Sequence, residues 1–107
     1  MSTLLTGWQF GRRDAAEWMP WGSDGLARAR VVAAADGYHL VEVEAQAGYT
    51  GTPHEHGHAE FTFVIEGTVR TNGQQLGPGD GCAAAAGSTH DSFEALTDAR
   101  YLSVFKL

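Results

Sequence analysis

This sequence has little cysteine, few basic residues and no long apolar run. The single cysteine, Cys82, excludes an internal disulfide and is compatible with a reducing compartment, so we expect a cytoplasmic protein. Seven basic against thirteen acidic residues give a net charge of −6, which is the wrong sign for binding nucleic acid or an anionic membrane surface. No apolar stretch is long enough for a membrane span. These absences leave a small globular domain with neither nucleic acid nor membrane among its expected partners.

Convincing helix signals are also missing, and only residues 14–19 have the composition for one helical turn. By contrast, 14 glycines separate short alternating or apolar runs, which is typical of β-strands. Asp36-Gly37 and Asn72-Gly73 are hairpin turn signals. The main predicted strands cover residues 27–34, 38–45, 60–67, 82–86, 90–95 and 99–106, with two shorter ones flanking Asn72-Gly73. We therefore predict an all-β sandwich or barrel over residues 26–107, preceded by a Trp-containing segment, residues 1–25, that packs onto it.

Four of the five histidines fall in two short segments. Residues 54–60 read HEHGHAE, and His90 stands in STHDSFE at 88–94. In an extended chain, side chains at i, i+2 and i+6 point to the same face, so His54, His56 and Glu60 can face one interior. Imidazole and carboxylate groups that converge from different strands are good ligands for divalent metals. Two histidines at this spacing alone are more often surface polarity, but the added glutamate and the later histidine predict a metal site.

Two longer patterns carry a family resemblance. Residues 48–67 read GYTGTPHEHGHAEFTFVIEG and match every fixed position of the first cupin motif, G-x5-H-x-H-x3-E-x6-G. Residues 79–94 read GDGCAAAAGSTHDSFE and match the glycines and histidine of the second motif, G-x5-P-x-G-x2-H-x3-N. Ala85 replaces the proline and Glu94 replaces the asparagine, and neither position is a metal ligand in the family. The sequence therefore resembles the cupin superfamily, through motifs that span less than half of the chain.

The resemblance implies a cupin double-stranded β-helix, that is, a jelly-roll barrel with one divalent metal ion inside it near one mouth. Carried over position by position, the metal ligands are His54, His56, Glu60 and His90. Fe(II) is the favoured ion, while Mn, Ni and Zn suit the same donors.

Cupins of this size differ widely in function, so three interpretations stay open. We favour a dioxygenase acting on a diketone or phenolic ketone, because a site of three histidines and one glutamate leaves room for substrate and O2. The second interpretation is a non-redox isomerase, lyase or cyclase, in which the ion polarises a carbonyl. The third is a small-molecule sensor without turnover, because both ends of the sequence resemble the cupin domains of zinc-binding anti-sigma regulators. Those regulators have a separate helical domain, of which this sequence shows no sign.

Besides Glu60, two residues are candidates for catalysis. His58 is a rim residue or a proton shuttle for bound substrate. Glu94 lies four residues after His90 and is either an acid–base group beside the cavity or a solvated strand end.

The expected partners are a small-molecule substrate and a second copy of the chain. A β-domain of 107 residues has exposed strand edges and few ways to cover them. Three tryptophans in the leading segment, Trp8, Trp18 and Trp21, add apolar area, so we expect a homodimer.

Overall fold

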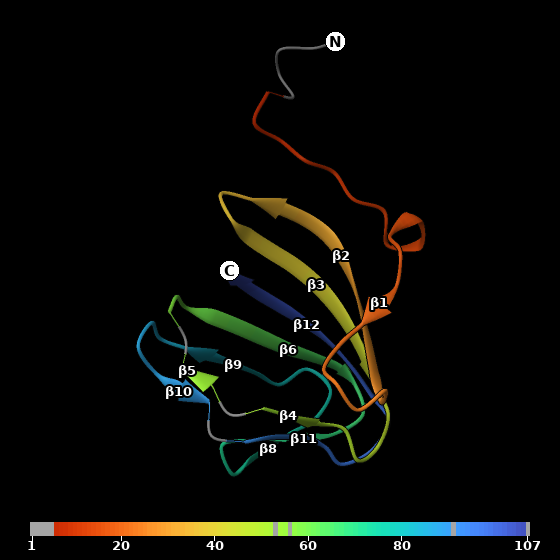
Figure 1. The fold of residues 1–107 in the computed structure, drawn as a ribbon, viewed down its shortest axis with the longest axis vertical. Coiled ribbons are helices and arrows are strands. Elements are labelled where there is room, and N and C mark those ends of the chain that lie inside the picture. Colours follow the sequence, from red (N-terminus) through yellow and green to blue (C-terminus); the bar gives the residue numbers. More distant parts are fainter. Residues whose placement is uncertain (1–5, 53, 56, 91, 107) are drawn as a thin grey trace.

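Two antiparallel β-sheets and a short strand pair make up the molecule (Figure 1). The structure, a computed structural model, describes residues 6–52, 54, 55, 57–90 and 92–106, except for the side chains of His54 and Glu55. Within this part of the chain, no helix has the length and apolar character needed to cross a membrane. The larger sheet has six strands in the order β1 (Met19–Pro20), β2 (Ala27–Ala35), β3 (Tyr38–Ala45), β12 (Ala99–Lys106), β6 (Glu60–Glu66) and β9 (Gly81–Ala84).

The smaller sheet has four strands in the order β4 (Thr50–Gly51), β11 (Phe93–Ala95), β7 (Val69–Thr71) and β8 (Gln74–Leu76). The separate pair consists of β5 (His54–Glu55) and β10 (Thr89–His90). A single turn of 3-10 helix, η2 (Arg13–Ala15), lies within the stretch that precedes β1. The all-β prediction is confirmed.

Both predicted hairpin turns are confirmed. Asp36 and Gly37 have φ of 54° and 83°, and Asn72 and Gly73 have φ of 45° and 80°. Positive φ at both central residues gives the turn a twist that matches the strands it joins, and Asn, Asp and Gly tolerate it best. The first turn joins β2 to β3 and the second joins β7 to β8.

The predicted strand 90–95 is two separate strands. β10 pairs with β5, whereas β11 pairs with β4 and β7 in the four-stranded sheet. A continuous polar-to-apolar pattern could not reveal that the chain changes sheets here, because alternation predicts an extended backbone but not its pairing partner.

The hydrophobic core lies between the two sheets. Val41, Val43 and Tyr101 from the large sheet pack with Val69 and Ala95 from the small one, all nearly inaccessible to solvent. Because side chains alternate along a strand, the six-stranded sheet has two distinct sides. We define the inner face as the side that bears Val41, Val43, Tyr101 and Ser103, and the outer face as the side that bears Leu40, Glu42, Leu102 and Val104.

The stretch before β1 crosses the β2–β3 part of the outer face. The indole of Trp18 lies between the guanidinium groups of Arg28 and Arg30, each 4.1 Å from the ring centroid. Such cation–π contacts are strongest when water is excluded from one side. Trp21 lies further along and packs at the edge of the core, 5.8 Å from Phe105.

Glu42 is the buried charge that fixes this stretch to the sheet. Glu42 lies on the outer face and is only 3% exposed, and Nε of Arg30 donates to its carboxylate at 2.6 Å. Nε of Arg13 donates to the same carboxylate at 3.0 Å, so a residue outside the sheet is tied to its centre. Burial on its own would raise the pKa of Glu42, but the hydrogen bonds from Arg13 and Arg30 outweigh it, and the net pKa lies below the usual value.

We predict that Glu42→Gln lowers the free energy of unfolding at pH 7 by about 3 kcal/mol, because it leaves the buried Arg30 without a counter-charge. A carboxyl whose pKa is depressed in the folded state stabilises the fold above its unfolded pKa, and that contribution disappears as the pH falls through the folded pKa. Urea unfolding of both proteins between pH 7 and pH 3 should therefore show the difference shrinking only on the acid side. A constant difference over that range would contradict this assignment.

Candidate metal centre

Two of the predicted ligands are brought together by backbone pairing. β5 and β10 run antiparallel, and His54 lies directly opposite His90 in their register. Residues that face each other across an antiparallel pair have Cβ atoms about 5 Å apart and point to the same side. The side chain of His54 and the whole of His56 lie outside the described residues.

Glu60, the third predicted ligand, is the first residue of β6. Its carboxylate points to the inner face, where the hydroxyl of Ser103 donates to Oε1 at 3.2 Å. Ser103 belongs to the neighbouring strand β12 and is itself only 3% exposed. A buried hydroxyl from an adjacent strand thus holds the orientation of the Glu60 carboxylate.

His90 is held from two directions. Its Nε2 is hydrogen bonded to the hydroxyl of Thr71 at 2.8 Å. Its ring meets Phe93 edge-on, with centroids 5.8 Å apart and an interplanar angle of 88°. These contacts come from strands β7 and β11 of the smaller sheet, so the imidazole projects between the two sheets.

Glu60 and His90 stand on a wall shared by two cavities. The first cavity has a volume of about 370 Å³ and the second about 280 Å³. Both are lined by Glu60, Thr62, His90 and Phe93. The first extends to Leu76 and to β9, and the second extends toward Trp21, Tyr49 and Tyr101.

The walls of these two cavities carry no cationic side chain. The other side chains of the first cavity are hydroxyl, amide, thiol and aliphatic groups, and those of the second are mostly aromatic or hydroxyl groups. Burial raises the pKa of Tyr101, and burial also raises the pKa of Tyr49, so both phenols stay neutral at physiological pH. None of the described lining residues is Lys or Arg, so these walls offer no ion-pair partner to an anionic group.

Two sequence-predicted candidates lie elsewhere. His58 is exposed and lines neither cavity. Glu94 is half-exposed, and its Oε1 lies 4.0 Å from a guanidinium nitrogen of Arg70, away from the cavity side of β11. Phe93 takes the inward position instead, as alternation along the strand requires.

Cys82 lines the first cavity, although no sequence signal pointed to it. Burial raises the pKa of its thiol, and the charge of Glu60 raises it further. The thiol therefore stays protonated and contributes a weakly polar wall. Its spacing from the motif residues is not distinctive, so only the pairing of Cys82 with Thr62 across β9 and β6 reveals its place.

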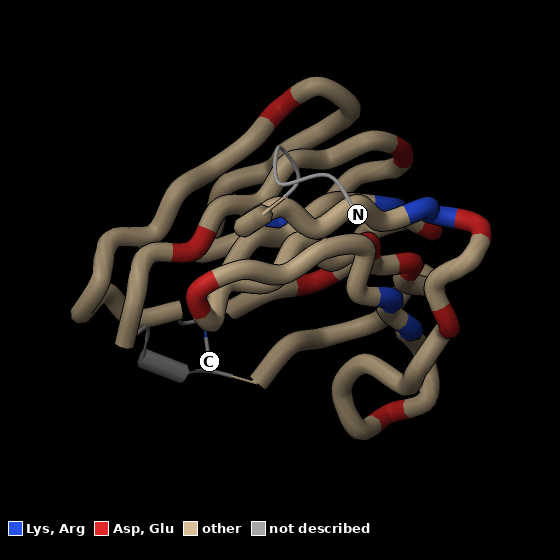
Figure 2. Tube along the Cα trace, turned by 90° about the horizontal axis from the view of Figure 1, so that it is seen from above, with Lys and Arg blue, Asp and Glu red and all other residues tan. Residues whose placement is uncertain are grey.

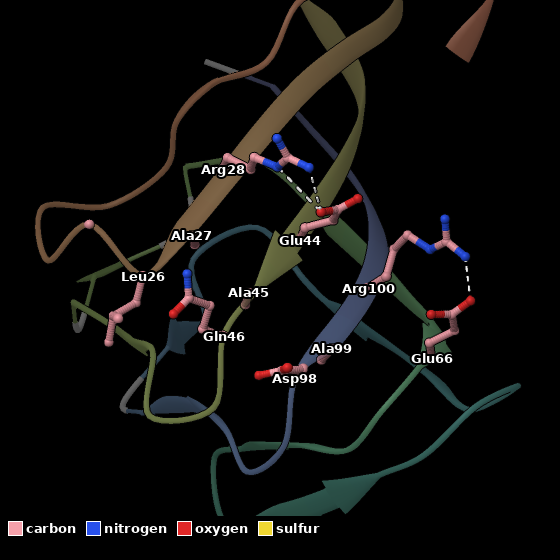
Figure 3. Close-up of a pocket in the computed structure, with 11 residues that line it drawn as sticks. Leu26, Ala27, Arg28, Glu44, Ala45, Gln46, Glu66, Asp98, Ala99 and Arg100 are labelled. Carbon is pink, nitrogen blue, oxygen red and sulfur yellow. Dashed lines mark hydrogen bonds and ion pairs between the residues drawn. The ribbon is translucent and has the colours of Figure 1, made fainter. Parts of the chain in front are cut away.

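A third cavity, of about 400 Å³, lies at the opposite end of the large sheet and has a different chemistry (Figure 3). Four of its charged groups are paired with each other, Arg28 with Glu44 and Arg100 with Glu66, and the Asp98 carboxylate accepts a hydrogen bond from the backbone N–H of Ala47. Figure 2 shows that most Lys and Arg positions gather on this side of the molecule, interspersed with acidic ones. Because the members of these two pairs neutralise each other, the pairs do not give the cavity a charge that would select an ionic ligand.

The residues around Glu60 fit a divalent metal ion. The carboxylate and the imidazole face the same interior space, and the backbone register brings His54 to His90. The described side chains alone contain no group of three His, Cys, Asp or Glu that could hold a metal. The site needs His54 and His56 as well, which is the donor set that the motif spacing predicts.

Nearly the whole chain matches a family model. The match is to the ChrR cupin-like domain and covers residues 9–106. This chain belongs to the ChrR cupin-like family. The cupin prediction is therefore confirmed. The match extends well beyond the two motifs and includes the strands before and after them. No curated protein matches the sequence at a significant level.

Solved structures show the same cupin fold. KdgF from Halomonas sp. is 27% identical, with a TM-score of 0.78 over 92% of this chain and 94% of that one. The anti-sigma ChrR, solved with SigE of Rhodobacter sphaeroides, is 21% identical, with a TM-score of 0.75 over 89% of this chain and 52% of that one. An acetylacetone dioxygenase from Acinetobacter johnsonii is 11% identical, with a TM-score of 0.72 over 83% of this chain and 67% of that one. At these identities the last two show the fold alone.

We predict that His54→Ala, His56→Ala and His90→Ala each lose most of the bound metal, and that Glu60→Ala loses somewhat less. Each change removes one donor from a set that binds a single ion. Elemental analysis of the purified proteins measures the loss. His39→Ala is the control, because His39 stacks on Phe105 and lines neither cavity at the site. Full occupancy in His90→Ala would contradict the four-ligand site.

Ser103→Ala should weaken metal binding by about tenfold without abolishing it, because it frees the Glu60 carboxylate to rotate. Ser103→Thr keeps the hydroxyl and should restore most of the affinity. Competition with a chromogenic chelator gives the dissociation constants. Equal affinities for the wild type and Ser103→Ala would show that the hydroxyl does not orient the ligand.

Proposed function

We propose that this protein is a metal-dependent dioxygenase that acts on an uncharged small molecule with two neighbouring oxygen donors, such as a diketone or a phenolic ketone. The observation that carries the proposal is the shared wall formed by Glu60 and His90, with a cavity on each side of it whose described lining residues include no Lys or Arg. Fe(II) is the proposed ion.

The substrate class follows from the chemistry of the cavity walls. A carboxylate or phosphate group that does not itself bind the ion loses hydration on entry and needs a cationic side chain in return. None of the described lining residues supplies one. A neutral dicarbonyl needs only hydrogen bonds and apolar contact, which hydroxyl groups and the ring of Phe93 provide.

The residues of this chain have separate roles in the proposal. Glu60 and His90, with His54 and His56, hold the ion, while Ser103 and Thr71 orient Glu60 and His90. Phe93 and Tyr101, with ring centroids 5.2 Å apart and an interplanar angle of 52°, give the second cavity an aromatic wall against which the substrate packs. When bound, the ion supplies Lewis acidity and, in the case of iron, one-electron chemistry. The proposal requires no proton transfer by His58 or Glu94.

The acetylacetone dioxygenase from Acinetobacter johnsonii supports the proposal only in that one protein of this fold acts on a neutral diketone. The same fold also occurs in an anti-sigma factor, and the family match runs over nearly the whole chain. This favours a second candidate function, a ligand-sensing cupin in which the same cavities bind a small molecule without turnover. The two candidates differ in what happens after binding.

We predict substrate-dependent O2 consumption by the Fe(II) form, measured with an oxygen electrode against β-diketones, hydroxyacetophenones, catechols and flavonols. The Zn(II) form should consume none, because zinc has no accessible redox change. Glu60→Ala should also consume none, since it lacks one of the ligands. Analogues of any active compound that carry a carboxylate away from the two oxygen donors should react at least about tenfold more slowly, because a buried carboxylate with no cationic side chain beside it costs more than about 1.4 kcal/mol.

The alternatives have distinct outcomes in the same assay. Turnover of a carbonyl compound by the Zn(II) form under strict anaerobiosis would overturn the dioxygenase in favour of Lewis-acid chemistry. Thermal stabilisation by a compound that no metal form converts would identify the sensor.

A further inference from the structure

The outer face of the six-stranded sheet is covered over one half and bare over the other. The stretch before β1 lies over β2 and β3, where Trp18 and Arg13 make their contacts. No described segment covers the other half, formed by β12, β6 and β9. Two phenylalanines of β6 stand out there, Phe61 at 54% and Phe63 at 48% exposure.

These phenylalanines form the side of a shallow apolar groove of about 510 Å³. Leu40, Leu102 and Val104 form the rest of its apolar floor. None of the residues that line the groove is charged, although the chain carries a net charge of −6. An uncharged apolar patch on a strongly acidic surface is where two like-charged molecules can approach with the least repulsion.

The first described residues form an arm that has the complementary character. We define the arm as residues 6–12, which run away from the body of the molecule beyond β2 (Figure 1). Trp8 is 70% exposed and Phe10 is 62% exposed, and their rings stack with centroids 6.0 Å apart. The middle of the arm is tied to β2, because the side-chain oxygen of Gln9 accepts a hydrogen bond from the backbone N–H of Ala34.

The arm also differs in charge from the rest of the chain. It contains Arg12 and no acidic residue, and Arg13 follows it directly. The residues outside the arm include six basic and thirteen acidic ones, a net charge of −7. The arm of one molecule is therefore attracted to the acidic body of another.

We propose that two copies of this chain form a symmetric dimer in which the arm of each copy packs its Trp8–Phe10 pair into the apolar groove of the other. Four half-exposed aromatic side chains per copy supply about 400–500 Å² of apolar area. The groove floor and the backbone of the arm bring this close to the roughly 800 Å² per partner that a stable interface buries. Because each copy offers one arm and one groove, a two-fold axis satisfies both at once.

The test uses a pair of double variants and sedimentation equilibrium at micromolar concentrations. The wild type should have twice the 11.4 kDa mass of the chain. Trp8→Ser/Phe10→Ser (the arm variant) removes the aromatic side chains of the arm in both copies. Phe61→Ser/Phe63→Ser (the groove variant) removes the aromatic side of the groove in both copies. Each should raise the dimer dissociation constant by about 100-fold, because each removes the aromatic anchors of both contacts.

Mixing the two double variants decides how the copies pair. Each mixed pair retains one intact contact, in which the unchanged arm of Phe61→Ser/Phe63→Ser packs into the unchanged groove of Trp8→Ser/Phe10→Ser. The mixture should therefore associate more tightly than either variant alone. Val31→Ser is the matched control and should leave the dimer unchanged. Val31 is also partly exposed, but it lies opposite Val41 and so belongs to the inner face.

Three results would overturn the proposal. The first is a monomeric wild type. The second is an arm variant that dimerises as well as the wild type, which would mean that the faces pair directly. The third is a mixture that associates no more tightly than the separate variants. Should Phe61→Ser/Phe63→Ser fail to fold, the arm variant decides alone, because its two side chains make no core contact.

Discussion

The pairing of strand β12 with both β3 and β6 is the constraint on which the other features depend. The last strand of the chain enters the sheet between an early strand and a middle one, so the large sheet is complete only when both chain ends are in place. Its alternating side chains then serve two sides. Tyr101 and Ser103 face the core and the candidate metal centre, whereas Leu102 and Val104 face outward. Since these residues share one backbone, a shift by a single residue would exchange the site with the outer surface.

The outer and inner faces of the six-stranded sheet differ in whether a carboxylate has guanidinium groups beside it. On the outer face, Glu42 is buried, but it accepts hydrogen bonds from the guanidinium groups of Arg13 and Arg30, which offset the free-energy cost of its lost hydration. On the inner face, the cavities beside Glu60 have no cation among the described lining residues. Three of the seven basic residues, Arg13, Arg28 and Arg30, help to fix the stretch before β1 to the sheet. This distribution leaves the interior suited to a neutral ligand and to a positive ion held by carboxylate and imidazole.

The candidate site lies where three structural units meet. β6 supplies Glu60, the pair β5–β10 supplies His54 and His90, and the smaller sheet supplies Thr71 and Phe93. A site assembled from both sheets is rigid only if the core between them is well packed, and Val64 and Val69 are fully buried there. The first cavity is bounded in part by small residues of β9, such as Gly81 and Ala84, which leave space that larger side chains would fill.

From the sequence alone, the motif spacing predicted the cupin fold, and the turn pairs Asp36-Gly37 and Asn72-Gly73 predicted two hairpins. These features are local, since a turn dipeptide or an HxH spacing acts within a few residues. Only the tertiary structure decided that Glu94 turns toward Arg70 while Phe93 enters the cavity, and that Cys82 and Ser103 lie near Glu60. It also decided which half of the outer face is covered by no described segment. Such outcomes depend on strand pairing between residues far apart in the chain, and that pairing leaves no signature within either strand.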